Sequence, residues 1–531
     1  MPWNPTLIDA EILAVHAAFL NYDRIAYFAG SQYDPRMPTG IDNTRLYNCD
    51  TGGIARVSGG PGFDLFCSGH ALSANGTLLA AGGTATYAGY RGVRDSAVIR
   101  YVPAGSEWKT VASFNENPNA DDRESGGRWY PTLLTLANGN ILALSGIPGT
   151  RDTESRNIIP EVFTPHPLSH GAWHWLGDYR NLVDRNLFAH HETPLYPRAL
   201  LLPTGDVFLP VAGARGRTVT MAVKENPWSA TFQDVCEFTP HVGADYSGYE
   251  ETAVLLPLLA GENYARRRVL IAGGREAWIL DLSHWDPGAT PPDQLFWEPS
   301  ERVLAGHPRR MHCNAVLLPT GHVLVVGGVA GTDAGESKDS TGVLTPEIYN
   351  PHTGKWSALT AHNEQAQIVR NYHSVALLMR DGRVWTAGSN HDGNPGVGTA
   401  EKKIEIYEPW YYGNPNRPEI LAAPDRWVTG GRFVLRTTQA SEIRRVAMVR
   451  TGSCTHAFNS DQRYVSLKFE YEGGDILNVT AAPNGNIAPS GMYFLYTINS
   501  QGLPSDGITI YQSTDPASDV EGAWEGLFRD S

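Results

Sequence analysis

A small residue followed by glycine recurs seven times along the chain, each time at the end of an apolar run. The doublets lie 53 to 67 residues apart, at Ala29-Gly30, Gly82-Gly83, Ser145-Gly146, Ala212-Gly213, Gly273-Gly274, Gly327-Gly328 and Ala387-Gly388. Self-similarity at a near-constant spacing indicates an architecture built from repeated units. Glycine suits this position because it lets the chain leave a strand in a conformation that other residues resist.

Each repeat has the pattern of a small β-sheet. A tight turn precedes most of the apolar runs, as in Asn75-Gly76, Asn138-Gly139 and Asp381-Gly382, and such turns join the two strands of a hairpin. An outer strand follows the doublet and ends on an aromatic-x-Pro triplet, as in Phe163-Thr164-Pro165. Units of about four strands, repeated seven times, predict a seven-bladed β-propeller. The glycine doublet makes the pattern resemble kelch repeats.

The repeats end near Gly413, and the rest of the chain has a different pattern. We expect residues 1–413 to form the kelch-like propeller. Residues 414–512 begin with a linker rich in Pro and Asn and then alternate as short strands, which favours an immunoglobulin-like β-sandwich domain. Residues 513–531 have no clear period and are expected to form a C-terminal tail. The prediction is an all-β chain, in keeping with 55 glycines and only 18% charged residues.

The charge and the cysteines exclude several classes of protein. A net charge of −14 disfavours nucleic acid or an anionic membrane as a partner. Apolar runs such as Ala253–Ala260 stop far short of the ~18 residues that a membrane span needs. Met1–Asp23 carries acids and lacks a basic start, so we expect no signal peptide. Five cysteines without a CxxC pair predict neither a disulfide framework nor a structural zinc site.

The repeat register picks out a set of reactive side chains. Sixteen residues before the second member of a doublet lie Cys67, Tyr130, His312 and Tyr372, the last followed by His373. Equivalent positions of different blades surround the propeller axis at one height, so we expect these side chains to share an axial site. Imidazole and phenolate suit Cu(II), whereas Mg²⁺ and Ca²⁺ prefer shells of oxygen atoms.

Each of these residues also has a structural interpretation when it is taken alone. A buried cysteine such as Cys67 is commonly a small hydrophobic residue. A tyrosine at the start of a strand commonly packs with its hydroxyl hydrogen-bonded. His70 and His312 are commonly hydrogen-bonded structural residues. The shared register weakens these interpretations but leaves them open.

Four local motifs carry a more specific signal. They are Phe66-Cys67-Ser68-Gly69, Arg128-Trp129-Tyr130-Pro131, Arg370-Asn371-Tyr372-His373-Ser374 and the segment from Thr455 to Arg463. Together, and in this order, they resemble the motifs of the copper radical oxidases, the family of galactose oxidase and glyoxal oxidase. The resemblance covers about residues 20–512.

Several details resemble the glyoxal oxidase branch more closely. Galactose oxidase carries a carbohydrate-binding domain before its propeller, which we do not expect here because few residues precede Cys67. It also stacks a tryptophan from the loop after its cross-linked tyrosine, whereas Ile147–Ile159 contains no tryptophan. Trp129, directly before Tyr130, and Ser68-Gly69-His70 fit glyoxal oxidase better.

The resemblance implies a copper site and a role for each motif residue. Tyr130 would be an equatorial ligand joined by a thioether to Cys67, and this cofactor, formed from the protein itself, would hold a radical. Tyr372 would be the axial ligand and the base that takes the proton of the substrate hydroxyl. His373 and His456 would be the equatorial nitrogen ligands, with a loop of the C-terminal domain carrying His456 into the propeller axis.

The activity that the resemblance implies is the oxidation of small aldehydes, as hydrates, or of primary alcohols. One copper ion and the tyrosyl radical would accept the two electrons, and O2 would reoxidise the site and leave as H2O2. The partners would be this small-molecule substrate and O2, with no nucleic acid and no membrane, and we expect a monomer. Members of the family are mostly exported, so the resemblance implies an extracellular protein although the chain shows no signal peptide.

Two other interpretations stay open. A non-catalytic kelch-type binding scaffold with a vestigial metal site would keep the fold without the chemistry. A copper or zinc hydrolase would use the His and Tyr ligands without a radical, but it leaves Cys67 unexplained and has no evident carboxylate base. Substrate choice is assigned to the loops Gly89–Asp95, Gly149–Ile159 and Val329–Ser340.

Overall fold

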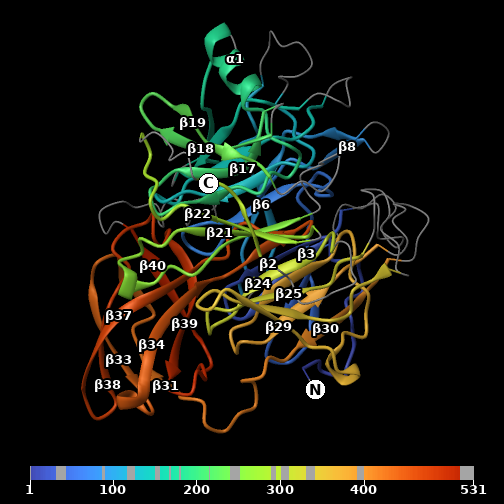
Figure 1. Ribbon diagram of the computed structural model, residues 1–531. Helices are drawn as coiled ribbons and strands as arrows, with labels where there is room; N and C mark the ends of the chain where they lie inside the picture. Colours follow the sequence, from blue (N-terminus) through green and yellow to red (C-terminus); the bar gives the residue numbers. More distant parts are fainter. Residues whose placement is uncertain are drawn as a thin grey trace.

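The structure is a computed structural model of the chain (Figure 1). It describes residues 2–30, 44–86, 90–103, 105–116, 126–149, 156–166, 169–178, 181–213, 216–239, 251–274, 276–288, 295–300, 310–330, 341–390 and 400–514. Most of the loop Gly149–Ile159, nearly all of Val329–Ser340, the first residue of Gly89–Asp95 and the expected tail beyond Thr514 lie outside the described residues. The fold that these residues build is β-rich, as the repeats predict.

Seven antiparallel sheets form the blades of the predicted seven-bladed propeller. The first three blades are β2 (His16–Leu20), β3 (Arg24–Phe28), β4 (Thr44–Asn48) and β5 (Ile54–Arg56); β6 (Gly69–Leu72), β7 (Leu78–Ala81), β10 (Ser96–Ile99) and β11 (Trp108–Val111); and β12 (Thr132–Thr135), β13 (Ile141–Leu144), β14 (Glu161–Thr164) and β15 (Ala172–Trp175). First strands of neighbouring blades contact one another, as β6 does β12, so the first strands surround the axis.

The remaining blades repeat this order, and the last is closed by the start of the chain. They are β16 (Leu200–Leu201), β17 (Val207–Ala212), β18 (Arg217–Lys224) and β19 (Ser229–Glu237); β20 (Thr252–Leu255), β21 (Arg268–Ala272), β22 (Ala277–Asp281) and β23 (Glu298–Ser300); β24 (Asn314–Leu317), β25 (Val323–Val326), β26 (Glu347–Asn350) and β27 (Lys355–Ala358); and β28 (Val375–Leu378), β29 (Val384–Ala387), β30 (Lys403–Tyr407) and β1 (Ile8–Asp9). Because β1 pairs with β30, the first and last segments of the propeller belong to one sheet.

The C-terminal part is one curled sheet of eight strands, drawn in orange and red in Figure 1. In sheet order the strands are β31 (Ile420–Ala422), β33 (Arg432–Thr437), β38 (Ile476–Thr480), β37 (Tyr464–Gly473), β34 (Ile443–Arg450), β39 (Gly491–Asn499), β40 (Ile508–Ser513) and β32 (Arg426–Val428). The first half of β37 pairs with β34 and its second half with β38, so this long strand links the two faces of the expected sandwich.

A hairpin from the C-terminal part joins the first blade. It consists of β35 (Ser453–Thr455) and β36 (Phe458–Asn459), and β35 pairs antiparallel with β2, His16 facing Thr455. The hairpin therefore continues the blade on the side of its innermost strand. The structure thus carries a segment of the C-terminal part to the propeller axis.

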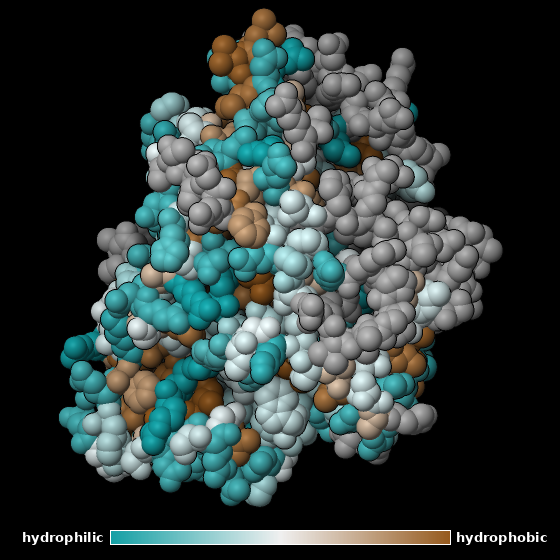
Figure 2. Space-filling model, viewed as in Figure 1, coloured by the Kyte–Doolittle hydropathy of each residue, from teal (hydrophilic) through white to brown (hydrophobic). Residues whose placement is uncertain are grey.

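In the part of the chain that the structure describes, few elements lie outside these sheets. They are the hairpin β8 (Thr84–Thr86) and β9 (Arg91–Gly92), the helix α1 (Leu182–His190), and the short 3-10 helices η3 (Ala260–Glu262), η5 (His362–Glu364) and η7 (Ala440–Glu442). Leu182 and Val183, at the start of α1, are exposed, and Figure 2 shows apolar atoms gathered at the top of the view over this helix. Among the residues that the structure describes, no helix has the length and apolarity that a membrane crossing requires.

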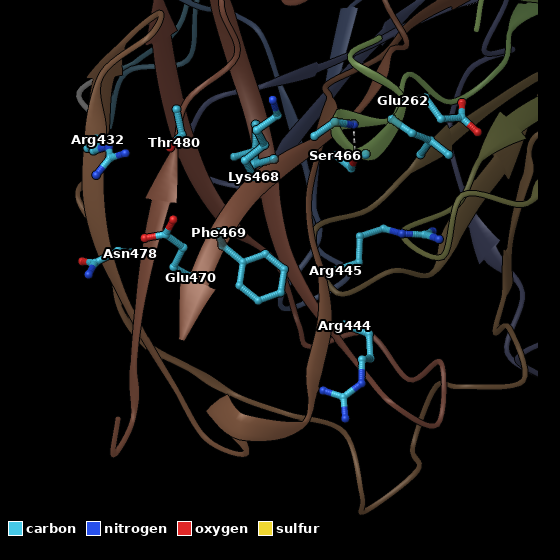
Figure 3. Close-up of a pocket in the computed structure, with 14 residues that line it drawn as sticks. Glu262, Arg432, Arg444, Arg445, Ser466, Lys468, Phe469, Glu470, Asn478 and Thr480 are labelled. Atoms are coloured by element: carbon cyan, nitrogen blue, oxygen red, sulfur yellow. Dashed lines mark hydrogen bonds between the residues drawn. The ribbon is translucent and has the colours of Figure 1, made fainter. Parts of the chain in front are cut away.

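A groove of about 580 Å³ marks where the C-terminal sheet meets η3 of the fifth blade (Figure 3). The Ala260 amide donates to Ser466 Oγ at 2.8 Å and ties the two parts together. The charged side chains of its lining are Arg432, Arg444, Arg445, Lys468, Glu262 and Glu470. None of the site residues predicted from the sequence lines this groove.

Candidate metal centre

The residues that lead into the innermost strands share an unusual backbone conformation. Their φ angles are 63° at Cys67, 65° at Tyr130, 44° at Tyr196, 60° at His312 and 65° at His373. A residue with a side chain adopts this left-handed region at a cost of roughly 1–2 kcal/mol. Its recurrence in five blades indicates that the fold imposes the conformation there and holds the side chains in it.

The left-handed residues refine the sixteen-residue register. The register matches them at Cys67, Tyr130 and His312. In the seventh blade the left-handed residue is His373, fifteen residues before Gly388, and in the fourth it is Tyr196, seventeen before Gly213. A Tyr-Pro dipeptide occurs at both Tyr130 and Tyr196, and this repeated pair was the available signal for Tyr196.

A buried arginine fixes this segment in three blades. The guanidinium donates to a carbonyl of the glycine doublet in each case, from Arg128 to Ser145 at 2.7 Å, from Arg310 to Gly327 at 2.7 Å, and from Arg370 to Gly388 at 2.8 Å. Each arginine stands two or three residues before the left-handed residue. The doublet and the site residue are therefore held together by a charge-assisted hydrogen bond, which is stronger than a neutral one.

The structure brings all five predicted site residues together. The hydroxyls of Tyr130 and Tyr372 are hydrogen-bonded to each other, and the Tyr130 and His456 rings lie 4.7 Å apart. The ring centroids of His373 and His456 are 4.6 Å apart. The Cys67 sulfur and a ring nitrogen from each histidine all lie within 4.8 Å of one another, and the three residues are buried.

The hairpin fixes which nitrogen of His456 is free. His456 Nδ1 lies 2.7 Å from Thr455 Oγ1, and that hydroxyl donates to the Val15 carbonyl at 3.0 Å. Because the hydroxyl proton is used on Val15, Nδ1 must donate, so Nε2 keeps its lone pair. Nε2 is buried, and it has no hydrogen-bond partner among the described residues. A buried imidazole lone pair of this kind is a donor atom for a metal.

Arg198 holds the turn that carries His456. Its Nη2 donates to the His456 carbonyl and its Nε to the Glu251 carbonyl, each at 2.7 Å, and its Nη1 donates to Tyr196 at 3.2 Å. The arginine is buried and so bridges the fourth blade, the residue before the fifth blade and the C-terminal hairpin. His456 itself is left-handed, with φ 47°, and Ala457 follows with φ 62°.

Burial sets the protonation of the site. It lowers the pKa of His373 to about 3 and the pKa of His456 well below its ordinary value, with neighbouring histidines adding to the effect at His456. Both imidazoles are therefore neutral at neutral pH, which is the form that binds a metal. Burial also raises the pKa of the Cys67 thiol, while a hydrogen bond with Tyr130 acts in the opposite direction.

Aromatic rings surround Tyr130. Trp129 stacks on it with a centroid distance of 3.6 Å and an angle of 8°, and Tyr196 lies 4.5 Å away. Tyr196 donates its hydroxyl proton to the Ser68 carbonyl at 2.9 Å. His16 Nε2 accepts the Cys67 amide proton at 3.2 Å. Sequence reasoning missed Tyr196 and His16; His16 lies outside the sixteen-residue register and gave no signal.

The two remaining histidines differ in their contacts. His312 lies 5.2 Å from the Tyr372 ring, whereas the Nδ1 atom of His70 is hydrogen-bonded to Ser453 Oγ. Burial lowers the pKa of each to about 3. Both are therefore neutral at neutral pH.

The donor set fits copper. Two imidazoles and two phenols form a set of nitrogen and oxygen donors that suits Cu(II). Soft metals prefer sulfur ligands, and Mg²⁺ and Ca²⁺ prefer shells of oxygen atoms. The free Nε2 of His456 and the convergence of the five side chains agree with a metal held at this place. The thiol of Cys67 is hydrogen-bonded to Tyr130. A thioether between the two residues would require this closeness.

Comparison with known proteins gives the family. A sequence model of the glyoxal oxidase N-terminus matches residues 61–411, and one of the galactose oxidase-like early set domain matches residues 417–511. The chain belongs to this family of glyoxal oxidases and galactose oxidases.

Two fungal relatives and one solved structure illustrate the similarity. A WSC domain-containing protein of Arthroderma benhamiae is 28% identical over 454 residues, which is 82% of this chain and 44% of that protein. Galactose oxidase of Gibberella zeae is 34% identical over 202 residues, 37% of this chain and 28% of that protein. The chain thus spans less than half the length of these two relatives.

The solved structure is a fungal alcohol oxidase of the AA5 family in complex with copper. It has a TM-score of 0.73 and 21% identity, and the match covers 96% of this chain and 99% of that one. At this identity the likeness concerns the fold, a propeller followed by a curled β-sheet part.

Proposed function

We propose that the protein is a copper-dependent radical oxidase that converts small aldehydes, as hydrates, or primary alcohols with O2 and releases H2O2. The observation that carries the proposal is the meeting of Tyr130, Tyr372, His373 and His456 in one buried place, with the thiol of Cys67 hydrogen-bonded to Tyr130. A structural role for each residue alone does not account for this convergence. Membership of the glyoxal oxidase and galactose oxidase family supports the proposal that the protein is an oxidase.

The proposed ligands are Tyr130, Tyr372, His373 and His456. Bound copper would supply one of the two oxidising equivalents and acidify the substrate oxygen. Tyr372 would take the hydroxyl proton of the substrate as a general base. Tyr130, joined to Cys67 by a thioether, would hold the radical and take the hydrogen atom from carbon.

The surroundings of Tyr130 suit a long-lived radical. Trp129 covers one face of its ring, and Tyr130 itself is 3% exposed. A covered, buried phenol is shielded from water and from reductants in solution. The stacked ring in this chain is Trp129, the residue directly before Tyr130 in the sequence. This arrangement supports a relationship to glyoxal oxidase.

The test is the cross-link itself. After copper loading in air, the peptides of Cys67 and Tyr130 should be recovered joined, with the loss of two hydrogens, one from sulfur and one from the ring. Cys67→Ser should abolish the cross-link and the radical and leave copper bound, whereas Cys236→Ser, at a buried cysteine of β19, should change neither. Separate peptides in the copper-loaded protein would contradict the proposal.

A peroxide assay identifies the substrate class. Copper-loaded protein would be offered glyoxal, methylglyoxal, glycolaldehyde, glycerol, galactose and benzyl alcohol, with O2 consumption measured alongside H2O2. We expect turnover of aldehydes or small alcohols and a poor response to galactose. A chain that binds no copper tightly would instead be the non-catalytic scaffold.

A further inference from the structure

An aromatic ladder leads from Tyr130 to the surface. Trp129 stacks on Tyr130 at 3.6 Å between centroids, and Tyr90 lies over Trp129 at 4.8 Å with an angle of 32°. The exposed fraction rises along this ladder from 3% at Tyr130 and 7% at Trp129 to 44% at Tyr90. The three rings therefore join a buried phenol to solvent by two short steps.

The packing around the ladder is specific. Tyr90 directly precedes β9 of the hairpin β8–β9, and Gly92 on β9 lies so close to the third blade that a Cβ would stand 2.3 Å from the Trp129 nitrogen. Only glycine permits this approach. Trp129 is fixed from the other side by a two-way backbone pairing with Ile147, at 2.8 and 2.7 Å. The contact of Tyr90 with Trp129 thus rests on β9 and on the backbone pairing of Trp129 with Ile147, and it is not a chance contact of a surface side chain.

The indole of Trp129 has a further property that suits transfer of an electron. Its Nε1 is buried and has no hydrogen-bond partner among the residues that the structure describes. An indole radical cation loses its proton to a nearby acceptor and is then trapped as a neutral radical. Without such an acceptor, a hole on Trp129 returns to a neighbouring ring.

We propose that Tyr90 and Trp129 form a one-electron conduit through which an outer-sphere oxidant at the surface generates the radical on Tyr130. This inference rests on the proposed function, since it concerns how the radical of that site is made. The catalytic cycle moves electrons in pairs, so a protein that has lost its radical needs a separate one-electron route to regain it.

The step balances with one electron and no proton transfer along the ladder. The Tyr130 side chain, deprotonated as a ligand, loses one electron and becomes the radical. When the hole lies on Tyr90, the phenol proton passes to water, and it is taken back when Trp129 supplies the next electron. Both rings thus return to their starting state. The oxidant at Tyr90 gains the electron; hexacyanoferrate(III), used here as the probe, becomes hexacyanoferrate(II). Apart from the reversible loss of the Tyr90 phenol proton, no bond is formed or broken.

Tyr196, a second tyrosine whose ring lies beside Tyr130, does not offer such a route among the described residues. Tyr196 lies 4.5 Å from Tyr130 but is only 2% exposed, and its own next neighbour is His456, at 4.4 Å. A path through Tyr196 therefore leads back into the centre. The Tyr90 end of the ladder is where a soluble oxidant can make contact.

The experiment follows radical formation in the absence of substrate. Copper-loaded, cross-linked protein is first reduced, then mixed rapidly with hexacyanoferrate(III), and the visible absorption of the radical is recorded. In Tyr90→Leu we expect the rate to fall at least tenfold. Tyr90→Trp, which keeps a stacked and oxidisable ring, should restore most of it. Tyr471→Leu, at another half-exposed tyrosine on β37, is the matched control and should leave the rate unchanged.

Two results would overturn the proposal, and they are distinguishable. An unchanged rate in Tyr90→Leu, with the cross-link and the final radical yield intact, would refute the conduit alone. If no variant, nor the unaltered protein, forms a cross-link or a radical, the proposed function fails and the conduit with it. Because no substrate is present, an effect of Tyr90 on substrate binding does not enter the measurement.

Discussion

The two ends of the propeller both use left-handed backbone, but only the end that holds the candidate centre gives it to a row of reactive side chains beside its glycine doublets. At the end that faces the C-terminal sheet, the hairpin turns place glycine there, with φ of 80° at Gly76, 95° at Gly205 and 82° at Gly321. At the end that holds the candidate centre, the same region is occupied by Cys67, Tyr130, Tyr196, His312 and His373. Glycine adopts it freely, whereas the others do so at a cost.

The difference separates a turn from a site. At the turn end the path of the chain matters more than the side chain. Glycine takes the left-handed position in five of the turns, whereas Tyr22 and Asp23 take it in the first blade and Asn263 and Tyr264 in the fifth. At the other end the side chain must be held in a fixed place, and the surrounding arginines and glycine doublets impose the conformation. Left-handed residues that lie two to four positions before an innermost strand therefore mark the centre, whereas Tyr22, Tyr90 and Tyr264 share the conformation elsewhere.

The largest effect is expected when the site end is made to resemble the turn end. His373→Gly removes a proposed ligand, so copper affinity should fall by more than about a hundredfold, beyond the range seen for partners of ligands. The same change relieves the left-handed strain at φ 65°. Without copper, His373→Gly should therefore be more stable than His373→Ala by about 1 kcal/mol. Calorimetric titration with copper and denaturant unfolding measure the two quantities. Equal stability of the two variants would contradict the assignment of strain to this end.

A smaller effect is expected from the partner of a ligand. Thr455→Val removes the hydroxyl that orients His456 Nδ1, so copper affinity should fall by about 10- to 100-fold. Thr455→Ser keeps the hydroxyl and should stay close to the unaltered protein. Competition with a chelator of known affinity measures the difference, and equal affinities in the two variants would show that the hydroxyl does not orient the imidazole.

The buried histidines predict how the metal-free protein responds to acid. Burial lowers the pKa of His312 from 6.5 to about 3, so the unfolded chain binds a proton at a pH where the folded chain does not. The stability from this residue is complete above pH 6.5 and is lost as the pH falls toward 3, at about 1.4 kcal/mol per pH unit. His312→Asn should reduce the slope of unfolding free energy against pH by that amount between pH 6 and 4. An unchanged slope would mean that His312 is charged in the folded protein.

The smallest effect is expected at the turn end. Gly321→Ala places a Cβ 3.3 Å from Arg445 Nη1 at φ 82°, so it should lower stability by about 1–2 kcal/mol and leave copper affinity unchanged. Gly354→Ala, at φ 68° with nothing within 4 Å of the Cβ, measures the strain without the contact. Thermal unfolding compares the two. A loss of copper affinity in Gly321→Ala would break the separation of the two ends.

The fold could be predicted because its signals are local. Each glycine doublet and each turn lies within its own blade, so the number of blades can be counted from the sequence without knowing any contact between distant residues. The register placed Cys67, Tyr130 and His312 correctly for the same reason. The register is off by one residue at His373 and Tyr196, because the segment from the turn glycine to the doublet differs in length among blades. It spans six residues from Gly382 to Gly388 and eight from Gly205 to Gly213, against seven in the other three blades.

The rest of the site depends on contacts that no local pattern contains. His456 was reached only through the resemblance to a family, since the pairing of its hairpin with β2 joins opposite ends of the sequence. His16 enters through the same pairing. The stacking of Tyr90 on Trp129 depends on the close approach at Gly92, which is visible only in three dimensions.

The pairing of β35 with β2 also orders the events of folding. The Thr455 hydroxyl and the Val15 carbonyl are hydrogen-bonded across 440 positions of the chain, and the contact needs both segments to have been synthesised. A chain emerging from the ribosome can complete all seven first strands while it still lacks His456. The proposed donor set therefore becomes whole only when synthesis has passed the hairpin, and copper uptake would report that the chain has reached this point.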